Sequence, residues 1–131
     1  MPFHLVRDFQ EAIIKLDKPD RGMLDMAQLE LAKNQMIEEV DEFVTAHEHH
    51  DYIGAIDAMV DLMYFAIGNL HKLGLSPAEM EKIFSEVHNC NMTKKRGVVE
   101  RRGDGSAPDA IKPEGWVGPE VRIAMVLEGH I

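Results

Sequence analysis

The stretch AIDAMVDLMYFAIGNL, residues 55–70, is mostly apolar and carries only two charges, Asp57 and Asp61. A segment from 52 to 72 that is apolar on nearly all sides predicts a central helix covered by other helices. The two aspartates are four positions apart, so they point from the same side of that helix. Two like charges on a largely buried helix repel each other and lose solvation. They must therefore be protonated or meet positive charge.

A second acidic stretch, QMIEEVDEF at residues 35–43, lies in a segment from 24 to 47 that is expected to form the preceding long helix. At helical spacing, Glu39 and Glu42 point together from the edge of the apolar face, and Glu38 lies one step behind them. Asp41 falls on the other side, where we expect it to be solvated. Facing carboxylates from two consecutive helices predict an acidic groove.

A hard divalent cation would neutralise the negative charge in this groove. Mg²⁺, or Mn²⁺ in its place, takes oxygen ligands, and few basic residues are near in the sequence. Two alternatives to a metal site stay open. The acids of residues 38–42 would form a solvated face of their helix, and Asp57 and Asp61 would be a hydrogen-bonded structural pair.

The rest of the chain also has helical periodicity. Residues 3–17 place Val6, Phe9, Ile13 and Leu16 at helical spacing. Ser76 to Glu79 form a capping box with proline at the first helical position, which opens a fourth helix. Residues 96–110 and 111–116 read as mostly loop, and a short last helix is expected near Pro119. The sequence thus predicts one all-α domain over residues 1–131, resembling a four-helix bundle with an extended C-terminal loop and a short terminal helix.

Composition restricts the class of protein. The chain has 131 residues, of which 45% are hydrophobic and 28% charged, as expected for one globular domain. Its net charge of -9 argues against nucleic-acid and anionic-membrane partners. The single cysteine, Cys90, excludes an intramolecular disulfide, and the N-terminus has no signal-peptide pattern. The apolar run from Leu62 to Leu70 is too short to span a bilayer. We expect a cytoplasmic protein.

Four segments resemble the all-α nucleoside triphosphate pyrophosphohydrolases, the MazG and phosphoribosyl-ATP pyrophosphohydrolase-like group. EEVDE (38–42) matches the EExxE motif, and DAMVDLMY (57–64) resembles the second acidic motif, ExxD. EVHNCNMTK (86–94) and KPEGW (112–116) are similar to segments of the phosphoribosyl-ATP pyrophosphohydrolase-like branch. These last two look especially close to the Deinococcus MazG-like dUTP pyrophosphatases. The segments occur in order over roughly residues 5–127.

The resemblance implies hydrolysis of a nucleoside triphosphate to the monophosphate and pyrophosphate. Glu39, Glu42 and Asp61 would hold Mg²⁺, and Glu38 would accept the proton of the attacking water. The first acid of ExxD aligns with Ala58, so Asp57 either substitutes from the neighbouring position or lies behind the ligands. dUTP is the first candidate substrate, on resemblance alone.

The substrate-binding candidates follow in the C-terminal part. Asn91 continues a helical row behind Phe84 and Val87, and Lys94 comes a turn later. Residues 94–112 hold six basic and three acidic residues, a local charge of +3 in an acidic chain. Binding of a polyanion would require such a basic segment. For Arg101 and Arg102, a position on a solvated loop is an equally good explanation. The basic candidates for phosphate contact are Lys94, Lys95, Arg96 and Lys112, and Trp116 either stacks on a base or packs the tail.

Other functions stay open. A di-iron carboxylate bundle needs ExxH motifs, and no histidine here follows a glutamate by three positions. HEHH (47–50) could bind a transition metal, but its place at a helix end favours a surface role. A non-catalytic nucleotide or metal sensor and a structural helical module remain as rivals. The all-round apolar third helix, together with the resemblance, predicts a homodimer or a dimer of dimers.

Overall fold

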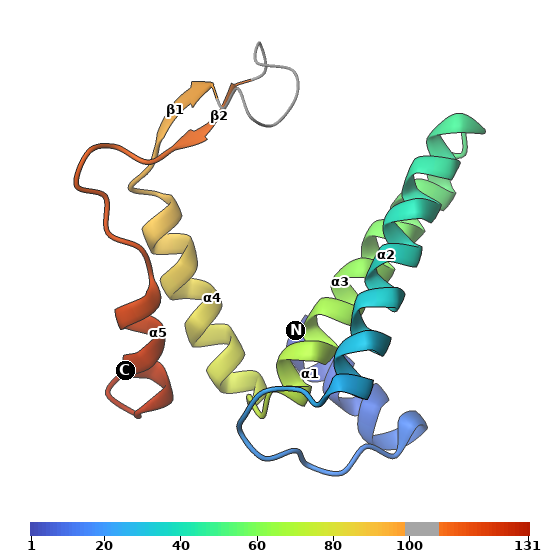
Figure 1. Cartoon of the computed structure of the whole chain (residues 1–131), viewed down its shortest axis with the longest axis horizontal. Helices are drawn as coiled ribbons and strands as arrows, with labels where there is room; N and C mark the ends of the chain where they lie inside the picture. Colours follow the sequence, from blue (N-terminus) through green and yellow to red (C-terminus); the bar gives the residue numbers. More distant parts are fainter. Residues whose placement is uncertain (99–107) are drawn as a thin grey trace. The chain divides into compact units, whose positions relative to one another are not determined.

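A computed structural model describes residues 1–98 and 108–131 of the chain (Figure 1). In chain order the elements are α1 (Pro2–Phe9), the π-helix η1 (Gln10–Ile14), α2 (Met26–Glu48), α3 (Tyr52–Lys72), α4 (Pro77–Asn91), β1 (Lys95–Val98), β2 (Pro108–Ile111) and α5 (Glu120–Leu127). The predicted all-α class is confirmed. The chain divides into two compact units, Met1–Pro77 and Ala78–Ile131. The single domain over residues 1–131 stays a prediction.

In the first unit, α2 and α3 lie side by side as a hairpin (Figure 1). Asp25 starts α2 with a capping box: its carboxylate accepts the Gln28 N–H at 2.8 Å, and the Gln28 side chain accepts the Asp25 N–H at 3.1 Å. Asp51 caps α3 by accepting the Gly54 N–H at 2.9 Å. These caps fix where each helix begins, and therefore which residues face the partner helix.

Small side chains let the two helices approach each other closely. The buried residues of the hairpin are mostly alanines, two from each helix: Ala32, Ala46, Ala55 and Ala58. Glu39 is buried in the same row of α2. The close packing of the helices thus draws one carboxylate into an otherwise apolar seam.

The buried residues of the N-terminal helix differ from the predicted apolar row. Val6 is buried, but Ile13 is 67% exposed and Gln10 is buried instead. Gln10 lies four residues after Val6, on the same face of the α period, whereas the extra residue in the π turn η1 turns the following Ile13 outward. The segment is nonetheless anchored to α3: the Gln10 amide donates to the Gly68 carbonyl at 3.2 Å, and the Phe9 ring meets Tyr64 edge-on at 5.4 Å between centroids.

The second unit contains α4, α5 and a two-stranded antiparallel sheet. Lys95 pairs with Ile111 and Val98 with Pro108. The sequence interpretation of 96–110 as loop is wrong for the residues of β1 and β2. Each strand has only four residues and no apolar alternation, so periodicity could not reveal them. Phe84 of α4, expected to face inward, is 66% exposed.

Apolar surface remains exposed on the hairpin. Leu29, Val40 and Val44 of the predicted inner face of α2 are 45–51% exposed. On α3, Ile53, Ile56, Val60 and Met63 are 48–79% exposed.

By length and composition alone, α3 could cross a membrane, with a mean hydropathy of 1.4 over an 18-residue window that is 22% buried. The core helix of a water-soluble protein passes the same test, and α3 carries Asp57 and Asp61 within its span. The exposed apolar faces of α2 and α3 are therefore expected to be buried against another surface.

Candidate functional site

Glu39 is the most constrained carboxylate of the hairpin. It is 8% exposed, and its Oε2 atom is buried without a hydrogen-bond partner in the described part of the chain. Burial raises its pKa to about 7, and a hydrogen bond with Glu42 and the charges of Glu42, Asp61 and Glu38 act in the same direction. Three acidic neighbours therefore surround one buried carboxyl group.

Asp61 reaches this group from α3. Its pKa is raised, first by burial and then by the charges of Asp57 and Glu42. Asp61 is half-buried, whereas Glu38, Glu42 and Asp57 are exposed. The predicted facing of the two acidic motifs is thus present in the first unit, with Glu39 and Asp61 deepest and the other three acids outside them.

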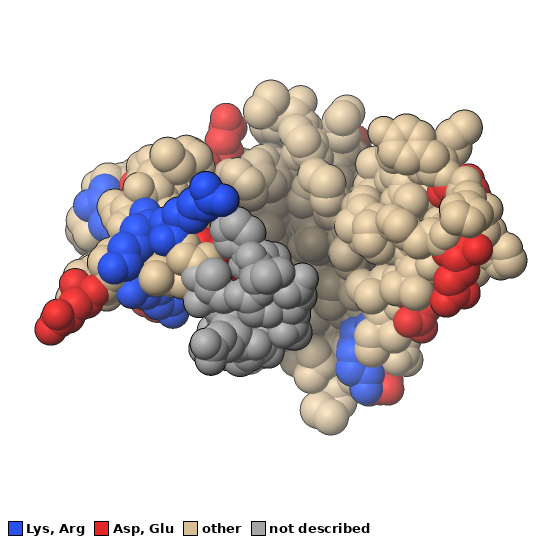
Figure 2. All heavy atoms as spheres, turned by 90° about the horizontal axis from the view of Figure 1, so that it is seen from above, with Lys and Arg blue, Asp and Glu red and all other residues tan. Residues whose placement is uncertain are grey.

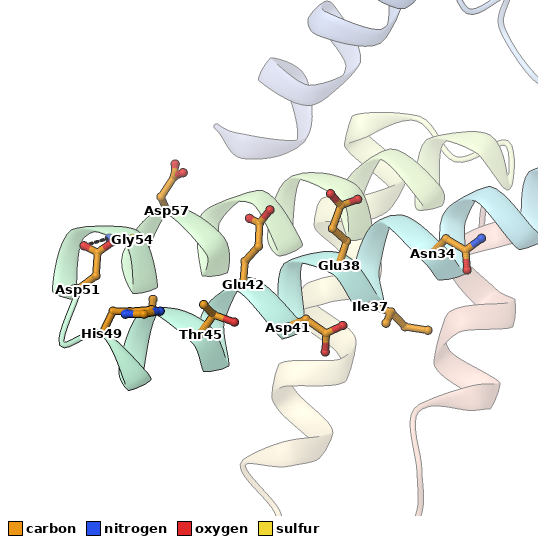
Figure 3. A pocket seen from close by; sticks show the side chains of 11 residues that line it. Asn34, Ile37, Glu38, Asp41, Glu42, Thr45, His49, Asp51, Gly54 and Asp57 are labelled. Atoms are coloured by element: carbon orange, nitrogen blue, oxygen red, sulfur yellow. Dashed lines mark hydrogen bonds between the residues drawn. The ribbon is translucent and has the colours of Figure 1, made fainter.

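An open groove runs along the outer side of these carboxylates (Figure 3). Glu38 and Glu42 of α2 and Asp57 of α3 line it and point toward the same side in Figure 3. Asp41 also borders the groove but points to a different side of α2. Glu39 and Asp61 do not line this groove, because they lie in the seam between the helices. The exposure of the acidic side chains therefore decreases across the site, from Glu38 and Asp57, which are exposed, to Glu39, which is buried.

The donor set fits a hard divalent cation. All five groups offer carboxylate oxygens, the ligands that Mg²⁺ prefers. A cation would supply the missing partner of Glu39 Oε2 and relieve the mutual repulsion that raises the two pKa values. Within residues 1–98 and 108–131, no three acidic, histidine or cysteine side chains already lie together as a metal-ligating cluster. Binding would thus require the carboxylates to turn toward the ion.

The second unit brings three predicted substrate-binding residues together. Lys94 Nζ and Lys112 Nζ lie 5.1 and 5.2 Å from the Trp116 ring centroid. The indole N–H of Trp116 donates to Thr93 Oγ1 at 2.7 Å and to the Cys90 carbonyl at 3.2 Å. Trp116 therefore joins the loop after β2 to the end of α4, and two cations accompany its ring.

The remaining basic candidates lie on β1. Lys95 and Arg96 are exposed there, and Asn91 is exposed at the end of α4. Figure 2, which looks down on the sheet, shows Lys and Arg side chains gathered at this place. Arg101 and Arg102 lie outside the described residues. The basic surface is thus concentrated around β1 and the Trp116 loop.

Gln10 is a polar residue of the site region that the sequence did not single out. It is 7% exposed and lines a small cavity with Tyr64 and Phe65. The helical period of residues 3–17 concealed it, because that period placed Ile13 inward. Its place four residues after Val6, on the same face of the α period, is the signal that could have found it.

Comparison with known proteins agrees with the fold and the acidic hairpin. The phosphoribosyl-ATP pyrophosphohydrolase family model matches residues 6–91, which is more than half of the chain. The chain therefore belongs to this family, part of the MazG-like all-α pyrophosphohydrolase superfamily. A comparison with curated proteins found no match.

Membership of this family confirms the resemblance to the superfamily, whereas the likeness of the two C-terminal segments to the Deinococcus MazG-like dUTP pyrophosphatases stays a prediction. It also defines the chain as a pyrophosphohydrolase acting on a nucleotide phosphoanhydride. The match contains every predicted carboxylate ligand and ends at Asn91. The lysines and Trp116 lie beyond it, so their role stays a prediction.

Proposed function

We propose that the protein is a Mg²⁺-dependent nucleoside triphosphate pyrophosphohydrolase that cleaves between the α and β phosphates. The products would be a nucleoside monophosphate and pyrophosphate. The observation that carries the proposal is the buried Glu39 carboxyl group, which has an unpartnered oxygen and acidic neighbours from both α2 and α3. Such an arrangement opposes folding unless the carboxyl group is protonated or meets a cation.

Glu39, Glu42 and Asp61 would hold the metal, and Mn²⁺ could replace Mg²⁺. A bound ion would supply positive charge for the phosphate oxygens and would acidify the attacking water. Glu38 is exposed next to these groups and accepts the proton of the attacking water. Asp57 either joins the ligands or orients them from behind, since it lies close enough to Asp61 to raise its pKa.

The basic residues of the second unit would contact the substrate. Lys94 and Lys112 present two ammonium groups around Trp116, and Lys95 and Arg96 follow on β1. Asn91 adds a neutral donor and acceptor at the end of α4. Their common chemistry suits the oxygens of a polyphosphate. Because the Trp116 N–H is held by Thr93 and Cys90 and the two lysines lie over the ring, stacking of a base on Trp116 would require a lysine to move aside.

dUTP is our first candidate substrate, because two C-terminal segments resemble MazG-like dUTP pyrophosphatases. The biological role would be removal of a non-canonical nucleotide from the cytoplasmic pool. No nucleic acid or membrane takes part in this proposal, in line with the net charge of -9.

The functional form would be a homodimer or a dimer of dimers. The support is the exposed apolar surface of α2 and α3, which includes Val40, Val44, Ile53 and Val60. Contiguous apolar surface on a folded chain marks an interaction site. A second copy of the same hairpin offers the matching surface in a two-fold assembly.

The rival is a non-catalytic nucleotide or metal sensor on the same scaffold. Product analysis separates the two functions. Purified protein is incubated with Mg²⁺ and each canonical and damaged triphosphate, and pyrophosphate and orthophosphate are measured.

Pyrophosphate with a monophosphate supports the enzyme. Orthophosphate with a diphosphate contradicts the proposed bond, and no product from any nucleotide favours the sensor. The matched pair of variants is Glu39→Gln, which should be inactive, and Asp41→Asn, which removes an exposed carboxylate of the same helix and should retain activity.

A further inference from the structure

A cavity of the first unit lies at the tip of the hairpin, where α2 ends and α3 begins (Figure 1). Its volume is about 250 Å³, and its wall includes His47, His50, Asp51 and Tyr52. None of the five acids proposed around Mg²⁺ lines it. His47 lies five residues after Glu42, which is about 7.5 Å along the helix axis. The histidine-lined cavity is therefore separate from the carboxylate site.

His47 is held in one tautomer. Its Nδ1 atom lies 2.7 Å from the Phe43 carbonyl oxygen, and its ring meets the Phe43 ring edge-on at 4.5 Å between centroids. A carbonyl oxygen can only accept, so Nδ1 carries the proton and donates the hydrogen bond. In the neutral imidazole, Nε2 then has the lone pair. Histidines that bind metals commonly donate their other ring N–H in this way, which fixes the direction of the ring.

The backbone places His50 next to this ring. α2 ends in a Schellman motif, in which the His50 N–H donates to the His47 carbonyl at 3.1 Å. The Asp51 N–H completes the motif by donating to the Ala46 carbonyl at 2.7 Å. His50 has a φ of 54°, the left-handed conformation that this motif requires. Glycine is the usual residue at this position, because a Cβ atom destabilises the left-handed conformation. A histidine there lowers the stability of the fold unless its imidazole makes a compensating interaction.

The sequence pattern HEHH (47–50) favoured a surface role, and its three histidines are exposed. The sequence could not show that two of them share one cavity, whereas His49 lines the acidic groove. Exposure does not oppose metal binding, because a bound ion can keep water among its ligands. The tautomer of His47 and the left-handed backbone of His50 are two independent reasons to assign a ligand to this cavity.

We propose that the tip of the hairpin binds a divalent transition-metal ion, with Zn²⁺ as the first candidate. His47 Nε2 and one ring nitrogen of His50 would be the protein ligands. Imidazole is a preferred ligand of Zn²⁺, Ni²⁺ and Cu²⁺, whereas Mg²⁺ prefers oxygen. No third acidic, histidine or cysteine side chain of the described ranges completes a metal-ligating cluster here, so water would fill the remaining coordination positions.

Such an ion would join the end of α2 to the turn that begins α3. Asp51 is not needed as a ligand, since its Oδ1 atom accepts the Gly54 N–H at 2.9 Å and caps α3 (Figure 3). A ligand that binds only the folded state raises the stability of that state. The ion would therefore stabilise the hairpin that carries the acidic groove. This inference does not depend on the proposed function.

The test follows the imidazoles directly by NMR. Full-length protein without a histidine tag, labelled with ¹⁵N in its histidine rings, is freed of metal with EDTA and transferred to chelator-free buffer. Zn²⁺ or Mg²⁺ is then titrated while the ring ¹⁵N signals are recorded. We expect Zn²⁺ to shift His47 Nε2 and one ring nitrogen of His50, and Mg²⁺ to leave both unchanged. Zn²⁺-induced shifts confined to other histidines, or no shift at all, would overturn the proposal.

Variants test the two ligands. His47→Gln and His50→Gly should each raise the Kd for Zn²⁺ at the tip by about tenfold or more. His49→Gln is the matched control, because it removes a neighbouring imidazole that lines the acidic groove instead of the cavity. Glu39→Gln separates the tip from the carboxylate site and should leave the Zn²⁺-dependent shifts of His47 and His50 in place. An equal loss of Zn²⁺ binding in His49→Gln, or the disappearance of these shifts in Glu39→Gln, would overturn the assignment.

Thermal unfolding distinguishes a metal ligand from a structural histidine. Glycine adopts a φ of 54° readily, so in EDTA His50→Gly should have a Tm equal to or above that of the wild-type protein. Zn²⁺ should raise the Tm of Glu39→Gln more than that of the double variant Glu39→Gln/His50→Gly, since only the single variant keeps both imidazoles. The same rise in both proteins would overturn the proposal, because the double variant would then bind Zn²⁺ without His50.

Discussion

Glu39→Gln tests the physical origin of the acidic site. The folded state raises the pKa of Glu39 from 4.5 to about 7. One pKa unit corresponds to about 1.36 kcal/mol, so the ionised form opposes folding by up to ~3 kcal/mol. Water at the open side of the groove screens part of this, and we expect on the order of 2 kcal/mol.

The sign of the pH dependence follows from linkage. A carboxyl group whose pKa is raised by folding contributes full stability below its unfolded pKa of 4.5, and loses it as the pH rises through about 7. The neutral amide does not titrate. In EDTA, Glu39→Gln should therefore match the wild-type protein at pH 4.5 and exceed it at pH 8.5, by roughly 5–10 °C in Tm for ~2 kcal/mol.

The assay is thermal unfolding followed by circular dichroism at both pH values, with Asp41→Asn as the control. Asp41 is exposed, so its variant should follow the wild-type protein at each pH. The reasoning would be refuted if Glu39→Gln had a lower Tm than the wild-type protein at pH 8.5. It would also be refuted if the two Tm values differed by the same amount at both pH values. Addition of Mg²⁺ should raise the Tm of the wild-type protein more than that of Glu39→Gln, since the variant lacks one proposed ligand.

Four further predictions concern the site and its assembly. Glu42→Gln or Asp61→Asn should abolish Mg²⁺-dependent turnover and leave the helical circular dichroism spectrum intact; wild-type activity in either would remove that ligand. Asp57→Asn should lower kcat more than a hundredfold if Asp57 is a ligand and about tenfold or less if it only orients Asp61. Lys112→Ala should raise the KM for the triphosphate about tenfold by loss of a charged contact, and an unchanged KM would return this residue to a structural role. Light scattering after size exclusion should give a dimer or tetramer, and Val60→Lys should shift it toward monomer; a monomeric wild-type protein would contradict the assembly.

The sequence determined the helices and the acids they carry. The apolar period of residues 52–72 and the spacing of Asp57 and Asp61 were sufficient to predict a central helix with an acidic side, because helical geometry is local. The EExxE pattern likewise placed Glu39 and Glu42 together. The two caps, Asp25 and Asp51, are also local signals, and they lie directly before α2 and α3.

Tertiary structure decided which acid is buried and which side chains of the N-terminal segment face inward. Glu39 is enclosed rather than Glu38 because the alanine seam of α2 and α3 passes through its position, and a pairing of two helices cannot be read from either one alone. Ile13 faces outward because η1 departs from the α period, and β1 pairs with β2 through backbone hydrogen bonds that leave no apolar pattern. Burial, desolvation and register depend on contacts between distant segments, and those contacts set the chemistry of this site.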